Sequence, residues 1–253
     1  MALPPRFEYL PQGWDPELIN KSGSWDSKAV VKKKAEAWQQ QVTSIQSPGV
    51  LAPTIDQHNL IITYGFVVGV VAQGKSSISV LDWGGGFGWY YNIAKSLFPS
   101  LKIDYHCRDV PTMVAQGRKL NAEILFHKDD RCFNRKYDLV MANGSVSYSP
   151  EWKQTILNLT NCSSKYIYLS KDALHGKAPT FAVLDRAYQY DNKNGHNMLI
   201  WFFNRSEYLS LVTGCGFSLL REFKLLNFSH EVINAPEQNR ERHGFLFHRD
   251  DNK

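Results

Sequence analysis

The hydrophobic positions of the sequence fall into short runs, and residues with helical spacing lie between most of them. From about residue 78 onward the runs have strand length and alternate with helical segments; they are SISVLDW, LKIDYHCRD, AEILFHKD, KYDLVMANG and KYIYLSKD. This alternation predicts an α/β domain with a mostly parallel sheet and helices on both of its faces. The later runs FSLLREFKL and HGFLFHRD are expected to close the sheet as an antiparallel pair.

The first part of the chain has a different pattern, and we expect residues 1–75 to form a helical extension that packs on a main domain of residues 76–253. Two segments have helical character, SWDSKAVVKKKAEAWQQQV and TIDQHNLIITYGFVVGVVA. The apolar run that begins at Asn59 is shorter than the about 20 residues needed to span a bilayer. We therefore expect no integral membrane segment.

Composition and charge narrow the classes of protein only slightly. The net charge of +5 mildly favours an anionic partner, such as a phosphorylated sugar, a nucleotide or a membrane surface. The basic residues are dispersed, however, so a small excess of lysine on a soluble protein explains the same value. The four cysteines form no CxxC pair, so neither a zinc site nor a disulfide scaffold is indicated, and a reduced cytoplasmic setting is expected.

Four glycines, Gly84, Gly85, Gly86 and Gly88, stand where the first run of the main domain meets a helical segment. A glycine-rich turn between a strand and a helix presents backbone N–H groups and lets a ligand approach closely. Ligands of open α/β sheets bind at the carboxyl ends of the strands. The sequence therefore predicts a nucleotide-like cofactor at this loop, and the alternative is a structural turn with no ligand.

The loop has the pattern D-x-G-x-G-x-G, with Asp82 followed by Gly84, Gly86 and Gly88. A dinucleotide fingerprint would have two residues before its third glycine, and that spacer is missing. The pattern resembles motif I of the class I S-adenosylmethionine-dependent methyltransferases. The resemblance implies a Rossmann-like, seven-stranded, mostly parallel sheet and S-adenosylmethionine as the cofactor.

Other positions match the same family. Asp109 lies 21 residues after Gly88, at the end of the next strand, where a carboxylate can accept hydrogen bonds from the ribose diol. Asp104 is a rival in the middle of that strand, and Asp109 could equally be a helix N-cap. In the family, an acidic or polar residue after the following strand often reaches the adenine amino group; Asp129 or Asp130 could do so here, and a plain turn is the alternative. The segment YDLVMANGSVSYSP resembles the motif IV region and would place Asn143 and Gly144 beside cofactor and substrate.

A narrower resemblance is to a less-studied bacterial methyltransferase family that commonly occurs with surface-polysaccharide biosynthesis. It rests on VLDWGGGFG, CRDVP, YDLVMANGSVSYS, APTFAV and MLIWFFNRSEYLSLVTGCGFSLL. Asp109 stands where that family more often has glutamate. The resemblance implies methylation of a sugar hydroxyl on a small-molecule acceptor, a nucleotide sugar or another saccharide. No NPPY-type sequence is present, so a nucleic-acid acceptor is not expected.

A sugar hydroxyl is a poor nucleophile, so the reaction would benefit from a base. We predict His175 in this role because it comes just after the fifth strand, and Asp172, close to it in the sequence, could orient it or act itself. His196 is possible, and His106 and His127 would line the pocket. No metal site is indicated. Two alternatives remain open: an NAD(P)-dependent Rossmann oxidoreductase, and a cofactor-binding protein without catalytic activity.

Overall fold

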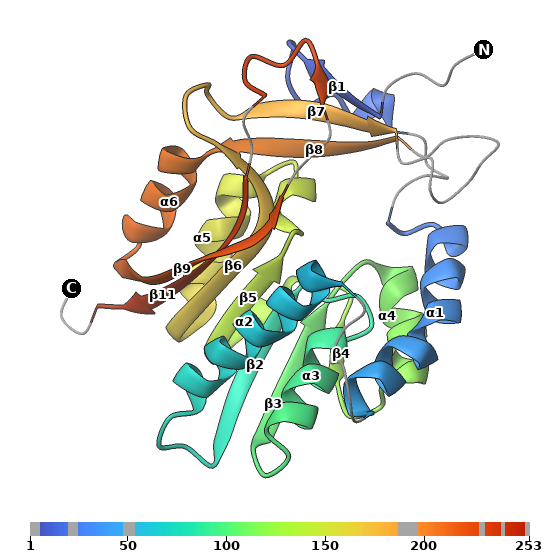
Figure 1. Ribbon diagram of the computed structural model, residues 1–253, viewed down its shortest axis with the longest axis vertical. Coiled ribbons are helices and arrows are strands. Elements are labelled where there is room, and N and C mark those ends of the chain that lie inside the picture. Colours follow the sequence, from blue (N-terminus) through green and yellow to red (C-terminus); the bar gives the residue numbers. More distant parts are fainter. Residues whose placement is uncertain are drawn as a thin grey trace.

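The computed structural model describes residues 6–19, 25–47, 54–186, 197–227, 231–238 and 241–250. Its main sheet has seven strands in the order β4, β3, β2, β5, β6, β11, β9 (Figure 1). Their bounds are β2 Ser77–Trp83, β3 Lys102–Arg108, β4 Leu125–His127, β5 Tyr137–Asn143, β6 Ser163–His175, β9 Phe217–Asn227 and β11 Glu241–Arg249. β11 is antiparallel to both β6 and β9, and the other pairs are parallel. The predicted seven-stranded, mostly parallel sheet with an antiparallel pair is confirmed.

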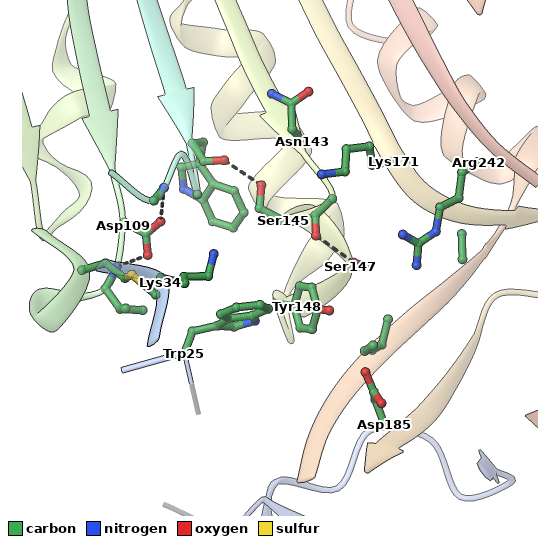
Figure 2. A pocket seen from close by; sticks show the side chains of 18 of the residues that line it. Trp25, Lys34, Asp109, Asn143, Ser145, Ser147, Tyr148, Lys171, Asp185 and Arg242 are labelled. Atoms are coloured by element: carbon green, nitrogen blue, oxygen red, sulfur yellow. Dashed lines mark hydrogen bonds between the residues drawn. The ribbon is translucent and has the colours of Figure 1, made fainter. Parts of the chain in front are cut away.

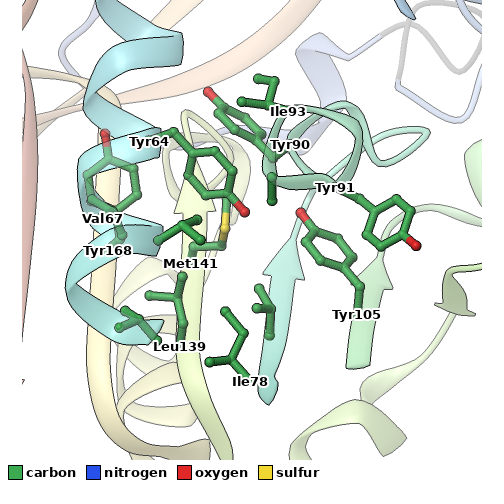
Figure 3. Close-up of a cluster of buried hydrophobic side chains, with 14 of the residues drawn as sticks. Tyr64, Val67, Ile78, Tyr90, Tyr91, Ile93, Tyr105, Leu139, Met141 and Tyr168 are labelled. Atoms are coloured by element: carbon green, nitrogen blue, oxygen red, sulfur yellow. The ribbon is translucent and has the colours of Figure 1, made fainter. Parts of the chain in front are cut away.

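Helices cover both faces of this sheet, as the alternating pattern predicted. One face carries α2 (Ile55–Ala72), α3 (Trp89–Leu97) and α4 (Pro111–Leu120), and the other carries α5 (Trp152–Cys162) and α6 (Arg205–Thr213). Neighbouring residues of β2 point to opposite faces, so Val80 belongs to the first core cluster and Leu81 to the second. Figure 3 shows the first cluster, where Tyr64 and Val67 of α2 lie near Leu139 and Met141.

Helix α2 is part of the core. Among the described residues it is the helix that is long and apolar enough, by length and composition alone, to cross a membrane; it has 18 residues. Tyr64, Val67 and Val68 on this helix are completely buried against the sheet. One side of α2 therefore packs within the domain, whereas Ile62 and Phe66 on the same helix are exposed. Thr54 begins the helix, because its side chain accepts a hydrogen bond from the Gln57 N–H.

A second, smaller sheet was not predicted from the sequence. It consists of β10 (Val232–Ile233), β1 (Phe7–Leu10), β7 (Phe181–Arg186) and β8 (Asn197–Asn204), in that order. β8 joins the main sheet by pairing with Leu174 and His175 at the end of β6. In Figure 1 this sheet lies beyond the ends of β5 and β6. The N-terminal segment expected to be helical therefore contributes a strand to it.

Two long helices, α1 (Lys28–Gln46) and α2, make up much of the described part of residues 1–75. Helix α1 packs on α3 and α4, and its residues Val30, Val31 and Trp38 form a core cluster with Phe87 and Met113. The described residues also include three short 3₁₀ helices, η1 (Pro16–Leu18), η3 (Asp130–Asn134) and η4 (Val146–Tyr148). η4 follows β5 directly and lies beside β8. The ends of β2, β3, β5 and β6 thus face α1 and the second sheet.

Candidate active site at the carboxyl ends of the strands

The glycine loop after β2 is folded tightly against its neighbours. Gly84 and Gly86 have left-handed backbones, with φ of +76° and +62°. A Cβ atom at Gly84 would lie 2.3 Å from Cβ of Ser145, whereas a Cβ atom at Gly86 would have no atom within 4 Å. Gly84 is therefore required for packing, and Gly86 is the glycine that faces open space.

Asp109 ties the loop to the end of β3. Its carboxylate accepts hydrogen bonds of 2.7 Å from the backbone N–H groups of Gly86 and Val110. Burial raises the pKa of Asp109, while these two hydrogen bonds and the nearby Lys34 oppose the increase. A carboxylate has about four acceptor positions, and two of them are used here. The remaining positions can accept a pair of hydroxyl groups from a ligand.

Two cavities meet at this loop. The first, about 350 Å³, extends from Gly86 and Asp109 to the second sheet (Figure 2). The second, about 670 Å³, lies between the loop and helices α1 and α2. Five residues line both cavities: Lys34, Gly84, Gly86, Asn143 and Lys171. A ligand that passes over Gly86 would therefore reach into both.

The second cavity contains buried polar atoms that find no hydrogen-bond partner among the described residues. They are Oδ1 of Asp82, Nε1 of Trp89, the hydroxyl of Tyr90 and Nδ2 of Asn143. The other carboxylate oxygen of Asp82 accepts a 2.7 Å hydrogen bond from Tyr105, and burial raises the pKa of Asp82 to about 7. Buried polar groups are normally paired, so these four atoms indicate a ligand with both donors and acceptors.

Lys171 is the functional candidate that the sequence analysis missed. Ser170 pairs with Gly244 and Ala173 with Arg242, so Lys171 and Asp172 together face His243 in a β-bulge. Lys171 has a φ of +70°, which is unusual for a residue other than glycine. Its side chain lines both cavities (Figure 2), and burial lowers its pKa to about 8, with Arg242 and Lys34 contributing in the same direction.

His175 and Asp172, the predicted base and its partner, line neither cavity. Asp172 accepts hydrogen bonds from the Ser147 N–H (3.2 Å) and from the Tyr208 hydroxyl (2.7 Å). The ring of His175 stacks on Phe181, and its Nε2 lies 3.2 Å from the Phe202 carbonyl oxygen. Both side chains are held within the protein, so their positions do not support the predicted catalytic roles.

We expect His175→Ala to lower stability rather than cofactor affinity. The side chain of His175 is fully buried, and its Nδ1 lies 3.2 Å from Oε2 of Glu237. Its removal leaves a cavity, which should cost about 2–4 kcal/mol of unfolding free energy. Chemical denaturation would measure this loss, and calorimetry should give an unchanged S-adenosylmethionine affinity. A fully stable variant would contradict the structural role.

The remaining predicted residues are divided between the cavity walls and the surrounding structure. Gly144 lines the first cavity, and its N–H donates to the Ser170 carbonyl (2.6 Å). Gly88 lines neither cavity; a Cβ atom there would lie 2.0 Å from Cδ1 of Ile124, so it permits packing of α3. Asp129 caps η3, forms an ion pair with Arg131 and lines neither cavity.

His106 and His127 do not enter the site. The rings of His106 and His127 stack on each other 5.0 Å apart, and neither residue lines a cavity. His196 lies outside the described residues. Within the part of the chain that the structure describes, no group of three or more histidine, cysteine, aspartate or glutamate residues could hold a metal ion.

Comparison with known proteins identifies the fold. No protein-family model matches the sequence, and no curated protein does. Solved structures do match. Magnesium protoporphyrin IX methyltransferase from Synechocystis, with bound S-adenosylmethionine (SAM), has a TM-score of 0.51 at 15% identity, covering 91% of this chain and 100% of that one. A SAM-dependent methyltransferase from Clostridium acetobutylicum has a TM-score of 0.53 at 11% identity, covering 87% and 98%.

A third match has a different kind of acceptor. It is 1,6-didemethyltoxoflavin-N1-methyltransferase from Burkholderia thailandensis, bound to its substrate and S-adenosylhomocysteine (SAH), with a TM-score of 0.50, 11% identity and 88% of each chain covered. The chain therefore has the Rossmann-like fold of the class I SAM-dependent methyltransferases. The matched enzymes differ in substrate, so the fold leaves the acceptor open.

Proposed function

We propose that the protein is a SAM-dependent methyltransferase that methylates a hydroxyl group of a small sugar or glycosyl precursor. The observation that carries the proposal is the loop of Gly84 and Gly86, which borders two joined cavities beside Asp109. SAM is elongated and has polar groups at both ends, which suits two cavities that meet over one glycine. The methyltransferase fold supports the same conclusion.

The residues present fit SAM in both cavities. The free acceptor positions of Asp109 suit the ribose diol, as predicted from its place after β3. In the second cavity, Oδ1 of Asp82 suits the ammonium group of the methionine part, and the donors of Trp89 and Tyr90 suit its carboxylate. When bound, SAM would supply an electrophilic methyl group on a sulfonium centre. Asn143 and Lys171 border the region between the two cavities.

The first cavity supports a sugar acceptor. Trp25 and Tyr148 line it and meet edge to face, with ring centroids 5.3 Å apart (Figure 2). Aromatic faces provide apolar area for the C–H groups of a sugar ring, and the polar wall residues suit its hydroxyl groups. The resemblance of several segments to a family found with surface-polysaccharide biosynthesis supports the same class of acceptor, in the cytoplasm.

Lys171 replaces His175 as the proposed base. A hydroxyl group becomes nucleophilic as its proton is removed, and a base must lie within hydrogen-bond reach. Lys171 borders both the cofactor region and the acceptor region, and its pKa of about 8 leaves part of the amine neutral near pH 7. The neutral Nζ would accept the hydroxyl proton, while Asn143 and the aromatic residues orient the two reactants.

Calorimetric titration with SAM, SAH and NADH tests the assignment of the cofactor. We expect SAM and SAH to bind, and we expect Asp109→Ala to weaken both by about 10- to 100-fold, because each hydrogen bond to a charged group contributes about 1.5–3 kcal/mol. Asp129→Ala is the matched control, since Asp129 lies outside both cavities. Binding of NADH without SAM would instead favour an oxidoreductase.

A further inference from the structure

The part of the first cavity beside the second sheet contains two arginines in apolar surroundings. Phe7, Ala173, Ile200 and Phe202 form the apolar wall, and Arg6 and Arg242 line the same cavity. Arg242 stands near the start of β11, paired with Ala173 of β6. In Figure 2 its guanidinium group points into the space between Lys171 and Asp185. Interactions of a charge are strong in such a partly buried, apolar setting.

Cationic side chains outnumber carboxylates around this cavity. Among the described residues that line it are five cations (Arg6, Lys34, Arg108, Lys171 and Arg242) and two acids (Asp109 and Asp185). Asp185 is held by Arg6 through two hydrogen bonds of 2.8 and 3.1 Å. Asp109 is held by backbone N–H groups at the opposite end. The lining of the cavity therefore has an excess of positive charge.

The buried Asp172 does not remove this excess from the cavity. Its charge acts on both Lys171 and Arg242, but it lies behind the cavity wall and its oxygens accept hydrogen bonds from Ser147 and Tyr208. Burial and the nearby Arg6 lower the pKa of Arg242, whereas Tyr148, Asp172 and Asp185 oppose this change. A bound anion would stabilise the charge of Arg242 further, because its fork of N–H donors matches a planar carboxylate or a phosphate.

We propose that the acceptor carries an anionic group, a phosphate or a carboxylate, that binds Arg242 beside the second sheet. This inference rests on the proposed function, since it concerns the acceptor of that reaction. The anion would fix one end of the sugar at Arg242, and a hydroxyl would then face Lys171. SAM itself carries a net positive charge, so its presence strengthens the preference for an anionic acceptor over a cationic one.

Titration of SAH-saturated protein with sodium phosphate and with sodium acetate tests the inference. Binding is followed by tryptophan fluorescence at constant ionic strength, because Trp25 and Trp83 line the cavity. We expect saturable binding of at least one anion, and Arg242→Ala should weaken it at least about tenfold through loss of the charged hydrogen bonds. Preference for phosphate indicates a phosphorylated acceptor, and preference for acetate a uronic-acid-like one.

Arg221→Ala is the matched control, because Arg221 is an exposed arginine on β9 that lines neither cavity. It should leave anion binding unchanged. Arg242→Lys keeps the positive charge but lacks the parallel N–H donors of the guanidinium group, so it should bind the anion with intermediate affinity. This variant also tests the inference if Arg242→Ala does not fold. Equal affinities in wild type, Arg242→Ala and Arg221→Ala, or no saturable binding of either anion to wild type, would overturn the inference. SAM binding distinguishes the two proposals: if wild type binds SAM but no anion, only the acceptor class fails.

Discussion

Replacing Gly86 with alanine is expected to abolish measurable SAM binding in a protein that still folds. A Cβ atom at this position meets no protein atom within 4 Å, so it projects into the space where the two cavities join. A ligand lying against the loop would collide with it. The left-handed backbone, with a φ of +62°, adds a stability cost of about 1–2 kcal/mol. Calorimetry with SAM and SAH measures the loss.

The strain of placing alanine in the left-handed backbone at residue 86 requires a separate control, which Gly216→Ala provides. Gly216 also has a left-handed backbone, with a φ of +80°, and a Cβ atom there would meet nothing within 4 Å. It lies between α6 and β9 and lines neither cavity. Gly216→Ala should thus lose similar stability and keep full affinity for SAM. If Gly86→Ala bound SAM as tightly as Gly216→Ala, the cofactor would not lie on this loop.

Replacing Lys171 with methionine should reduce methyl transfer by about 10²- to 10⁴-fold, the usual contribution of a positioned general base. Affinity for SAM should change little. Protonated Lys171 cannot accept the proton, so in wild type kcat/KM should rise with pH and level off above the pKa of about 8 to which burial lowers this amine. An acceptor found by screening phosphorylated and uronic sugars with SAM would allow the pH profile to be measured.

Lys165 on the same strand provides the comparison for Lys171. It is exposed, and its Nζ lies 5.5 Å from the centroid of the Tyr166 ring. Lys165→Met removes the same charge away from the cavities and should keep both the rate and the pH profile. Lys171→Arg should remain slow, because a guanidinium group stays protonated. A Lys171→Met enzyme with normal turnover and an unshifted profile would exclude Lys171 as the base.

The main sheet and the glycine loop could be predicted because their signals are local. Runs of apolar residues that alternate with helical segments predict a parallel sheet with helices on both faces. The glycines between Asp82 and Trp89 predict the turn between the strand and the helix. Asp109 could be found by its distance along the chain. In each case a few neighbouring residues carry the information, and the structure has the predicted mostly parallel sheet and brings Asp109 to the loop.

The second sheet and the candidate base depend on contacts that no local pattern encodes. β1 pairs with β7 between residues some 175 positions apart, such as Phe7 and Asp185. The runs TFAVLDR and MLIWFFN have strand-like composition and could have indicated β7 and β8. The sequence does not indicate which side chains at the end of β6 face the cavity, because a bulge there changes the alternation of side chains along the strand. The bulge places Lys171 in the wall of the cavity, whereas Asp172 and His175 are buried away from it.

The two sheets share backbone pairing at two described residue pairs, Leu174 with Phe203 and His175 with Asn204, and Phe203 also packs on Trp152 and Tyr208. The loop and Asp109 belong to one sheet, whereas Phe7, Asp185 and Phe202 on the other form the far wall of the first cavity. Under the proposed function, substitutions in β1, β7 and β8 would therefore change the acceptor side of the first cavity and leave the residues proposed to hold SAM in place.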